Sequence, residues 1–230
     1  MSKKIFSKYQ KRGAYHWDQI GNHPIKSNAF VKARYNKCVD LIKGHVETTS
    51  KILDVGCGDG ALSYLLYREG FKVTGIDVDE LGINLAIKQH NKKKTSCIFS
   101  CMSSSELPDS SFDAIVCSDV IEHVDDAHQL IGDIQRILKP GGVAIISTPI
   151  RITEKVLDPE HVVEWFPTEF EKLFSGFDVQ FCTSHPVGLM EMMNWKWSRT
   201  MINLITIVTN PFYWKKNFRL FALQFACMHK

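Results

Sequence analysis

The sequence lacks the patterns that mark a zinc-binding, membrane-spanning or secreted chain. Its seven cysteines form no C-x-x-C pair, and the closest two, Cys97 and Cys101, have no second pair with which to complete a tetrahedral zinc site. We therefore expect reduced thiols, a cytoplasmic protein and no bound metal. The basic start at residues 1–4 is not followed by an apolar signal segment, and no uncharged apolar run reaches the length of a membrane span.

Acidic residues are missing from one end of the chain. Between Asn194 and Lys230 there are six lysines and arginines but no aspartate or glutamate, although the whole chain has a formal net charge of only +3. In other respects the composition is that of an ordinary globular protein, with 44% hydrophobic and 23% charged residues. A length of 230 residues fits one α/β domain with a sizeable core.

Apolar strand-like runs alternate with helical patterns from residue 51 onward. Strands are expected at 51–55, 71–76, 96–101, 112–117, 143–147, 177–183 and 218–228. Asp79 is expected to cap one helix, and Thr168 with Glu171 to form a capping box that starts another. This alternation predicts a doubly wound α/β fold with a mostly parallel, seven-stranded sheet.

We expect a single domain over residues 1–230 with four parts. These are an N-terminal helical arm (1–50), a ligand-binding core (51–185), an insertion (186–217) and the last strand (218–230).

A glycine-rich turn, Gly56-Cys57-Gly58-Asp59-Gly60, directly follows the first expected strand. In a doubly wound sheet, ligands bind at the carboxyl ends of the strands, and glycines there let a ligand approach the backbone. Asp77 ends the second strand, about 20 residues downstream, where a carboxylate can accept ribose hydroxyls. Because Ala61 stands where the NAD-binding pattern allows its third glycine, the turn alone is also compatible with NAD.

Five segments in the same order resemble class I S-adenosylmethionine-dependent methyltransferases. They are 51–60, 73–77, 106–113, 121–124 and 138–142, and together they are similar to the small-molecule branch that includes the ubiquinone-biosynthesis O-methyltransferases. The resemblance is dense over residues 51–148 and looser through 181. It implies S-adenosylmethionine as the cofactor, and five ordered motifs are far more specific than the glycine turn alone.

The resemblance also implies roles for individual residues. Gly56, Cys57 and Gly58 would hold the methionine moiety, and Asp54 would orient the loop or meet the amino group. Asp77 and the neighbouring Val78 would bind the ribose side of the cofactor, and Met102 and Ser103 would flank adenine. Ser103 stands where the commoner pattern has an acid, so that contact would be weaker. Ser118 and Asp119 would border the sulfonium and the acceptor.

Two histidines are candidate catalytic groups. Methyl transfer to a hydroxyl calls for a general base, whereas transfer in general needs mainly alignment and exclusion of water. His123 follows the fourth expected strand, and His161 lies in the loop after the fifth. Each has a structural alternative: His123 could simply pin its loop, the same holds for His161, and Trp165 beside His161 could be a core aromatic residue.

Two aromatic segments lie outside the alternation. Residues 15–17 (Tyr-His-Trp) would form a lid over the cofactor or a hydrophobic anchor for the arm. Residues 190–220 combine methionines and aromatic residues with basic ones and would form a lid over an apolar acceptor, a peripheral contact with the inner membrane surface, or a packed helix. Nucleic acid is a less favoured partner. The run at 210–213 (Asn-Pro-Phe-Tyr) is interpreted as a turn.

The sequence therefore predicts a methyltransferase that O-methylates a small, lipid- or glycan-linked molecule. The alternatives are a binding module that has lost catalysis and an RNA-modifying methyltransferase. The oligomeric state is not predicted.

Overall fold

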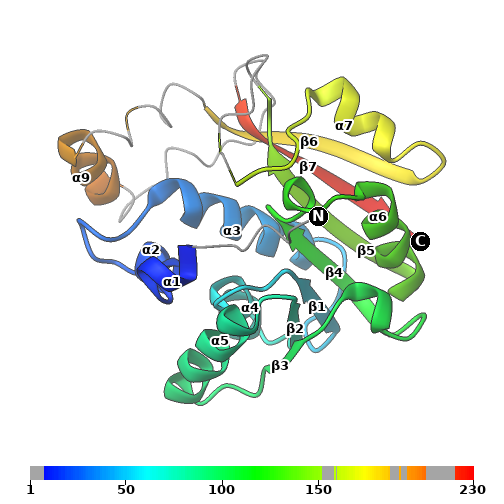
Figure 1. Ribbon diagram of the computed structural model, residues 1–230, viewed down its shortest axis with the longest axis horizontal. Helices are drawn as coiled ribbons and strands as arrows, with labels where there is room; N and C mark the ends of the chain where they lie inside the picture. The colour runs from blue at the N-terminus through cyan, green and yellow to red at the C-terminus, as the bar shows by residue number, and fades with distance from the viewer. Residues whose placement is uncertain (1–7, 152–157, 159, 187–191, 193–195, 206–220) are drawn as a thin grey trace.

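The chain folds around a seven-stranded sheet in the order β3-β2-β1-β4-β5-β7-β6 (Figure 1). The computed structural model describes residues 8–151, 158, 160–186, 192, 196–205 and 221–230. The strands are β1 (Lys51–Val55), β2 (Lys72–Asp77), β3 (Ile98–Cys101), β4 (Phe112–Ser118), β5 (Leu138–Pro149), β6 (Asp178–Pro186) and β7 (Phe221–His229). Strands β1 to β5 run parallel to one another, while β7 is antiparallel to both β5 and β6. The expected doubly wound, mostly parallel sheet is confirmed.

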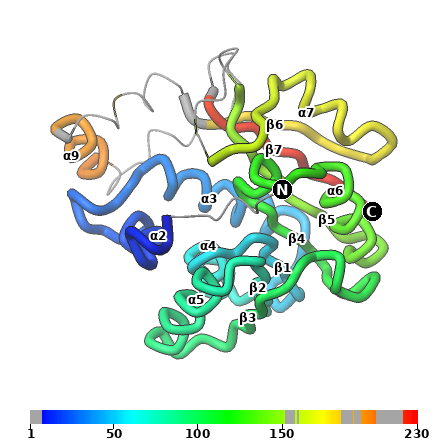
Figure 2. Tube along the Cα trace, viewed as in Figure 1, coloured from blue at the N-terminus to red at the C-terminus, as the bar shows by residue number. Residues whose placement is uncertain are grey.

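Helices cover both faces of this sheet. They are α1 (Lys8–Arg12), α2 (Tyr15–Ile20), α3 (Ala29–Lys43), α4 (Ala61–Arg68), α5 (Glu80–Lys93), α6 (Ala127–Ile137), α7 (Pro167–Leu173) and α9 (Lys196–Ile205). Two 3-10 turns, η1 (Ser104–Glu106) and η2 (Ile121–His123), follow β3 and β4. The trace in Figure 2 places α2 beside α3, and α9 at the edge of the molecule.

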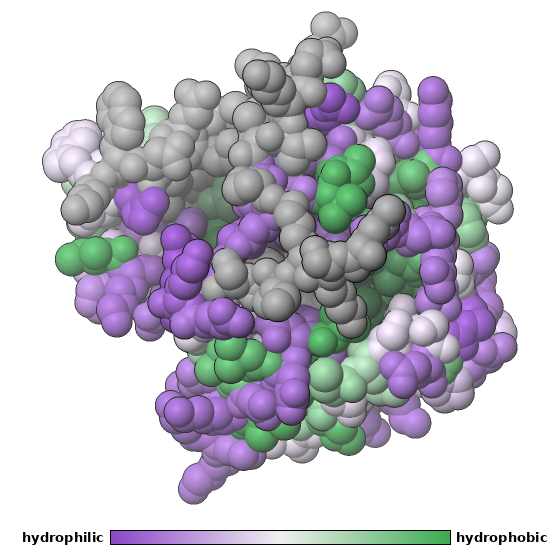
Figure 3. All heavy atoms as spheres, in the orientation of Figure 1, coloured by the Kyte–Doolittle hydropathy of each residue, from purple (hydrophilic) through white to green (hydrophobic). Residues whose placement is uncertain are grey.

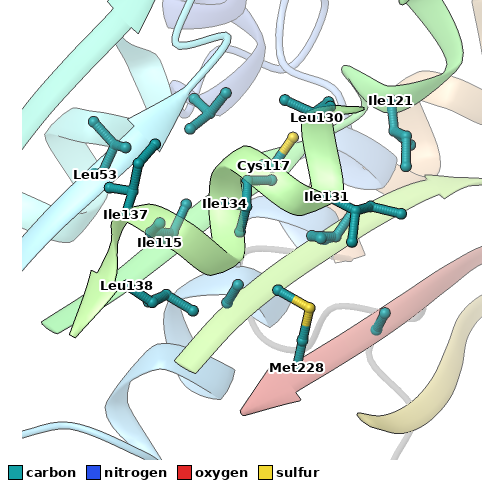
Figure 4. Packing of buried hydrophobic residues seen from close by; sticks show 14 of the residues in the cluster. Leu53, Ile115, Cys117, Ile121, Leu130, Ile131, Ile134, Ile137, Leu138 and Met228 are labelled. Atoms are coloured by element: carbon teal, nitrogen blue, oxygen red, sulfur yellow. The ribbon is translucent and has the colours of Figure 1, made fainter. Parts of the chain in front are cut away.

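The core is split between the two faces of the sheet. On one face, α6 turns its expected stripe of Leu130, Ile131, Ile134 and Ile137 onto β1, β4, β5 and β7 (Figure 4). On the other face, α3 and α4 pack over the same strands through a second apolar cluster. All seven cysteines are among the described residues, and all are free thiols.

Strand order reverses between β1 and β4, which lie on either side of the switch point. The loops that follow these strands and β2 therefore open on one carboxyl edge. On the side of the molecule seen in Figure 1, the described surface shows hydrophobic patches separated by hydrophilic residues (Figure 3). No helix in the described ranges is long and apolar enough to cross a membrane.

Two local expectations need correction. The capping box at Thr168 is wrong, because α7 already begins at Pro167 and the Glu169 carboxylate accepts the Phe166 N–H at 3.0 Å. Strand β7 is described from Phe221, so the expected start at 218 lies outside the described residues. The turn expected at 210–213 lies outside them as well.

Candidate active site

A cavity of about 790 Å³ lies at the carboxyl edge of the sheet, between the glycine turn, the N-terminal arm and the loop after β5. Of the twelve residues expected at the site, ten line this cavity: Gly56, Cys57, Asp77, Val78, Met102, Ser103, Ser118, Asp119, His123 and His161. Asp54 and Gly58 are not among the lining residues. The fold therefore gathers, in one space, residues that are far apart in the sequence.

The glycine turn needs its glycines for two different contacts. Gly56 has a φ of +67°, and a Cβ there would overlap the Val120 side chain. Gly58 has a φ of +51°, and a Cβ there would overlap the Tyr9 hydroxyl. Both positions therefore exclude side chains by backbone conformation and by space. Gly58 makes room for the arm, a role that the sequence did not indicate.

Asp77 lies at the end of β2 and is held by backbone donors. It accepts the Gly58 N–H and the Asp79 N–H, each at 2.9 Å. Burial raises the pKa of Asp77, against the opposing effect of these donors. Asp79 caps α5 by accepting the Leu81 N–H at 3.0 Å, as expected. Asp77 is thus not needed as a helix cap, and it faces the cavity.

Asp54 lies behind the glycine turn rather than in the cavity. Its carboxylate accepts a hydrogen bond of 2.5 Å from the Ser63 hydroxyl at the start of α4. Burial raises its pKa to about 7, although the Ser63 hydroxyl acts in the opposite direction. This position fits the loop-orienting role.

The segment after β3 holds Ser103 in a local cap. The Ser103 N–H donates to the Glu106 carboxylate at 2.7 Å, and its hydroxyl accepts the Ser105 N–H at 3.4 Å. Ser103 and Met102 both line the cavity. The Ser103 hydroxyl therefore already accepts a hydrogen bond within η1, although Ser103 also lines the cavity.

The N-terminal arm is both an anchor and a wall of the cavity. The Trp17 indole N–H donates to the Asp59 carbonyl oxygen at 2.6 Å, and the His16 backbone N–H donates to the Asp59 carboxylate at 3.0 Å. Trp17 also packs against Tyr64 and His90. Its neighbours Tyr15 and His16, together with Tyr9, line the cavity. The two interpretations of residues 15–17 thus describe different side chains of one segment.

A buried ion pair that the sequence did not reveal joins the arm to the switch point. The Arg34 guanidinium on α3 pairs with the Asp119 carboxylate after β4, and both residues line the cavity. Burial by itself would lower the pKa of Arg34, but Asp119 holds it above its ordinary value. Asp119 has a φ of +54°, which is uncommon for aspartate, and its other oxygen accepts the Ser147 hydroxyl at 3.1 Å.

The two candidate histidines meet across the cavity, with ring centroids 4.9 Å apart. His161 Nδ1 lies 2.6 Å from the Glu164 carboxylate, and His123 Nδ1 lies 3.0 Å from the Glu160 carbonyl oxygen. In each case Nδ1 is the donor, which leaves Nε2 as an acceptor in the neutral ring. Burial lowers the pKa of His123, and the nearby His161 and Lys8 act in the same direction.

Three groups here could ligate a cation. Glu122, His123 and His161, called the donor cluster below, offer ligand atoms within 4.8 Å of one another. Glu122 is fully buried, and one of its oxygens accepts the Thr148 hydroxyl at 3.0 Å. The other oxygen has no hydrogen-bond partner among the described residues. Burial and the neighbouring Asp119 carboxylate raise the pKa of Glu122.

Comparisons with known proteins place the chain beside enzymes that transfer methyl groups. A family model described as a methyltransferase domain matches residues 53–146. The ubiquinone biosynthesis O-methyltransferase of Rickettsia bellii is 32% identical over 176 residues, covering 73% of this chain and 72% of that protein. Its counterpart in Rickettsia typhi is 33% identical over 175 residues, covering 73% and 70%.

A solved structure shares the fold across the full chain. The phosphoethanolamine N-methyltransferase 2 of Haemonchus contortus in complex with S-adenosyl-L-methionine has a TM-score of 0.70 at 19% identity. The similarity covers 100% of this chain and 60% of that one. At this identity the comparison establishes the fold alone.

Proposed function

We propose, from the premise that this chain belongs to the S-adenosylmethionine-dependent methyltransferase family, that it methylates a hydroxyl group of a small, lipid-linked molecule. One observation carries the proposal: a single cavity contains the glycine turn, Asp77 and a histidine oriented by a carboxylate. The printed names of the relatives specify O-methylation, and the apolar and basic character of residues 190–220 supports a lipid-linked acceptor.

The described residues fit S-adenosylmethionine. Asp77 would accept the ribose hydroxyls, Gly56 and Cys57 would border the methionine moiety, and Met102 would contact adenine. Arg34 would meet the methionine carboxylate, because its buried Nε has no hydrogen-bond partner among the described residues. When bound, the cofactor supplies a methyl group on a sulfonium, which leaves as a neutral thioether.

His161 would act as the general base. Its Nδ1 donates to the Glu164 carboxylate, so that Nε2 can accept the proton of an acceptor hydroxyl. A buried carboxylate at this position also stabilises the imidazolium that forms. His123 hydrogen-bonds a neutral carbonyl oxygen instead and is the weaker candidate. The arm residues Tyr9 and Tyr15 would exclude water from this end of the cavity.

A divalent cation in the donor cluster is the second candidate role for the same histidines. Two imidazoles and a carboxylate are suitable ligands, and the unpartnered Glu122 oxygen favours this reading. The absence of a metal remains our primary expectation, since burial and the neighbouring Asp119 carboxylate raise the pKa of Glu122 and so disfavour its charged, metal-ligating form.

Methyl transfer to aromatic hydroxyl probes, with and without a polyprenyl chain, tests the proposal. We expect S-adenosylhomocysteine release with the prenylated probe. In His161→Ala we expect kcat to fall by at least about 100-fold. Glu164→Gln should lower kcat in the same direction, while cofactor affinity stays unchanged in both variants. The exposed His128→Ala is the matched control.

Two results would replace the proposal by its alternatives. Cofactor binding without transfer to any hydroxyl probe would favour a binding module. Retention of tRNA at low salt, with methyl transfer to it, would favour RNA modification.

A further inference from the structure

The outer face of α9 is apolar, which reverses the usual arrangement of a surface helix. Trp197, Met201, Leu204 and Ile205 recur at i, i+4, i+7 and i+8, and their exposed fractions lie between 43% and 76%. Such a stripe normally faces the core of a globular protein. Here it faces outward, at the edge of the molecule seen in Figures 1 and 2.

The inner face of α9 is fixed by polar contacts. The Asn203 side chain is buried, and its oxygen accepts the Ala29 N–H at 3.2 Å. Its amide nitrogen donates to the carbonyl oxygens of Pro24 at 3.0 Å and Ser27 at 2.8 Å. These bonds set the rotation of α9 and hold the loop that carries Ile25, which is itself 69% exposed. The hydrogen bonds of Asn203 therefore hold the apolar stripe of α9 toward the outside of the fold.

We propose that this face docks on a bilayer that contains anionic phospholipid. The α9 surface is defined as Trp197, Met201, Leu204 and Ile205 of the helix together with Ile25 of the neighbouring loop. The helix has 10 residues and is about 15 Å long, half of the roughly 30 Å hydrocarbon core, so it lies along the surface rather than across it. Tryptophan and aliphatic residues on one face of such a helix suit the boundary between headgroups and acyl chains.

Charge selects an anionic lipid surface over a second copy of the chain. Helix α9 carries two basic residues, Lys196 and Arg199, and no acidic residue. Basic residues that flank an interfacial helix are attracted to anionic headgroups. Pairing two copies through the same face would instead bring together two helices whose charged residues are all basic, and like charges oppose such an interface.

The α9 surface is also connected to the cavity. Ile202, on the inner face of α9, packs with Ala29 and Ala33 of α3, and Phe30 packs against this cluster. Phe30 lines the cavity as well. The packed side chains of Ile202 and Phe30 therefore connect the inner face of α9 with the cavity. This link rests on the proposed function, in that a lipid-linked acceptor would reach the site from the membrane side.

Vesicle sedimentation of the full chain tests the proposal. Two kinds of vesicle are compared: neutral vesicles of pure phosphatidylcholine, and anionic vesicles of phosphatidylcholine with about 30% phosphatidylglycerol. We expect pelleting with the anionic vesicles, weakened at high salt, and at least about tenfold weaker binding in the Trp197→Ser, Leu204→Ser double variant. Met201→Ser is a second, milder variant. Ile98→Ser is the matched control, because Ile98 is 63% exposed on the distant strand β3.

Three outcomes would overturn the docking face: no pelleting, equal pelleting of the double variant, or an equal loss in Ile98→Ser. A dimer in solution that Leu204→Ser dissociates would overturn it in favour of a second copy. Thermal melting and S-adenosylmethionine titration of each variant show that the fold is kept. Pelleting is measured without a methyl acceptor. Pelleting with anionic vesicles together with no methyl transfer to any hydroxyl probe would therefore contradict the proposed acceptor chemistry but support the docking face.

Discussion

Replacing Asp54 by asparagine should stabilise the protein at neutral and basic pH. Asp54 is buried behind the glycine turn, and burial raises its pKa from 3.8 to about 7. The unfolded chain therefore releases this proton at a lower pH than the folded chain does. The contribution of Asp54 to stability therefore falls as the pH rises from about 4 to about 7, and it changes little above pH 7.

The size of the effect follows from the shift in pKa. A shift of about 3 units corresponds to about 4 kcal/mol at full ionisation, at 1.36 kcal/mol per unit. At pH 5 the buried Asp54 already lowers the free energy of unfolding by about 1.5 kcal/mol. The remaining loss of about 2.5 kcal/mol therefore develops between pH 5 and pH 8. Asparagine keeps an oxygen that can accept the Ser63 hydroxyl, so Asp54→Asn removes the charge with little change of shape.

Urea unfolding of the cofactor-free protein between pH 5 and pH 8 measures this difference. The advantage of Asp54→Asn over the unsubstituted chain should grow by about 2.5 kcal/mol across this range. In Ser63→Ala the loss of stability should extend to higher pH, because the Ser63 hydroxyl stabilises the ionised carboxylate. A difference between Asp54→Asn and the unsubstituted chain that stays constant with pH would refute the reasoning.

Three further outcomes follow from the site. Gly58→Ala should displace Tyr9 and weaken cofactor binding by at least about tenfold. Gly141→Ala is the control, because Gly141 has a similar positive φ but nothing within 4 Å of an added Cβ; it should lower the free energy of unfolding in urea by only about 1 kcal/mol. Trp17→Phe should lose the bond to the Asp59 carbonyl oxygen and cost about 1 kcal/mol, with faster proteolysis of the arm; an unchanged cleavage rate would contradict the anchor. Methyl transfer should survive dialysis against EDTA, and a loss restored by Mg²⁺ or Zn²⁺ would assign the donor cluster to a cation.

The sheet was predictable because its signals are local. Buried parallel strands appear as short apolar runs, and the stripe of α6 appears as a helical period, so both can be recognised without knowledge of contacts. Asp79 was identified as the cap of α5 for the same reason. The start of α7 was misplaced because Glu169 and Glu171 both offer a cap-forming carboxylate, and only the path of the chain decides between them.

The site was predictable where a motif follows a strand and not where tertiary contacts complete it. Tyr9 and Arg34 reach the cavity from the arm, and no spacing in the sequence connects them with Gly58 or Asp119. The role of Gly58 is fixed by a side chain 49 positions away along the chain. Glu164 orients His161 from three residues downstream, a local signal that could have been read as a histidine–carboxylate pair.

Titration calorimetry with S-adenosylmethionine tests the central claim most directly, in a matched pair of variants. Asp77 and Asp79 are two residues apart, but only Asp77 lines the cavity, and asparagine also serves well as a helix cap at position 79. We predict that Asp77→Asn weakens binding by at least about tenfold, or about 1.4 kcal/mol, while Asp79→Asn leaves it within about twofold. Failure of the unsubstituted protein to bind, or equal affinity in the two variants, would contradict the placement of the cofactor at the glycine turn and Asp77.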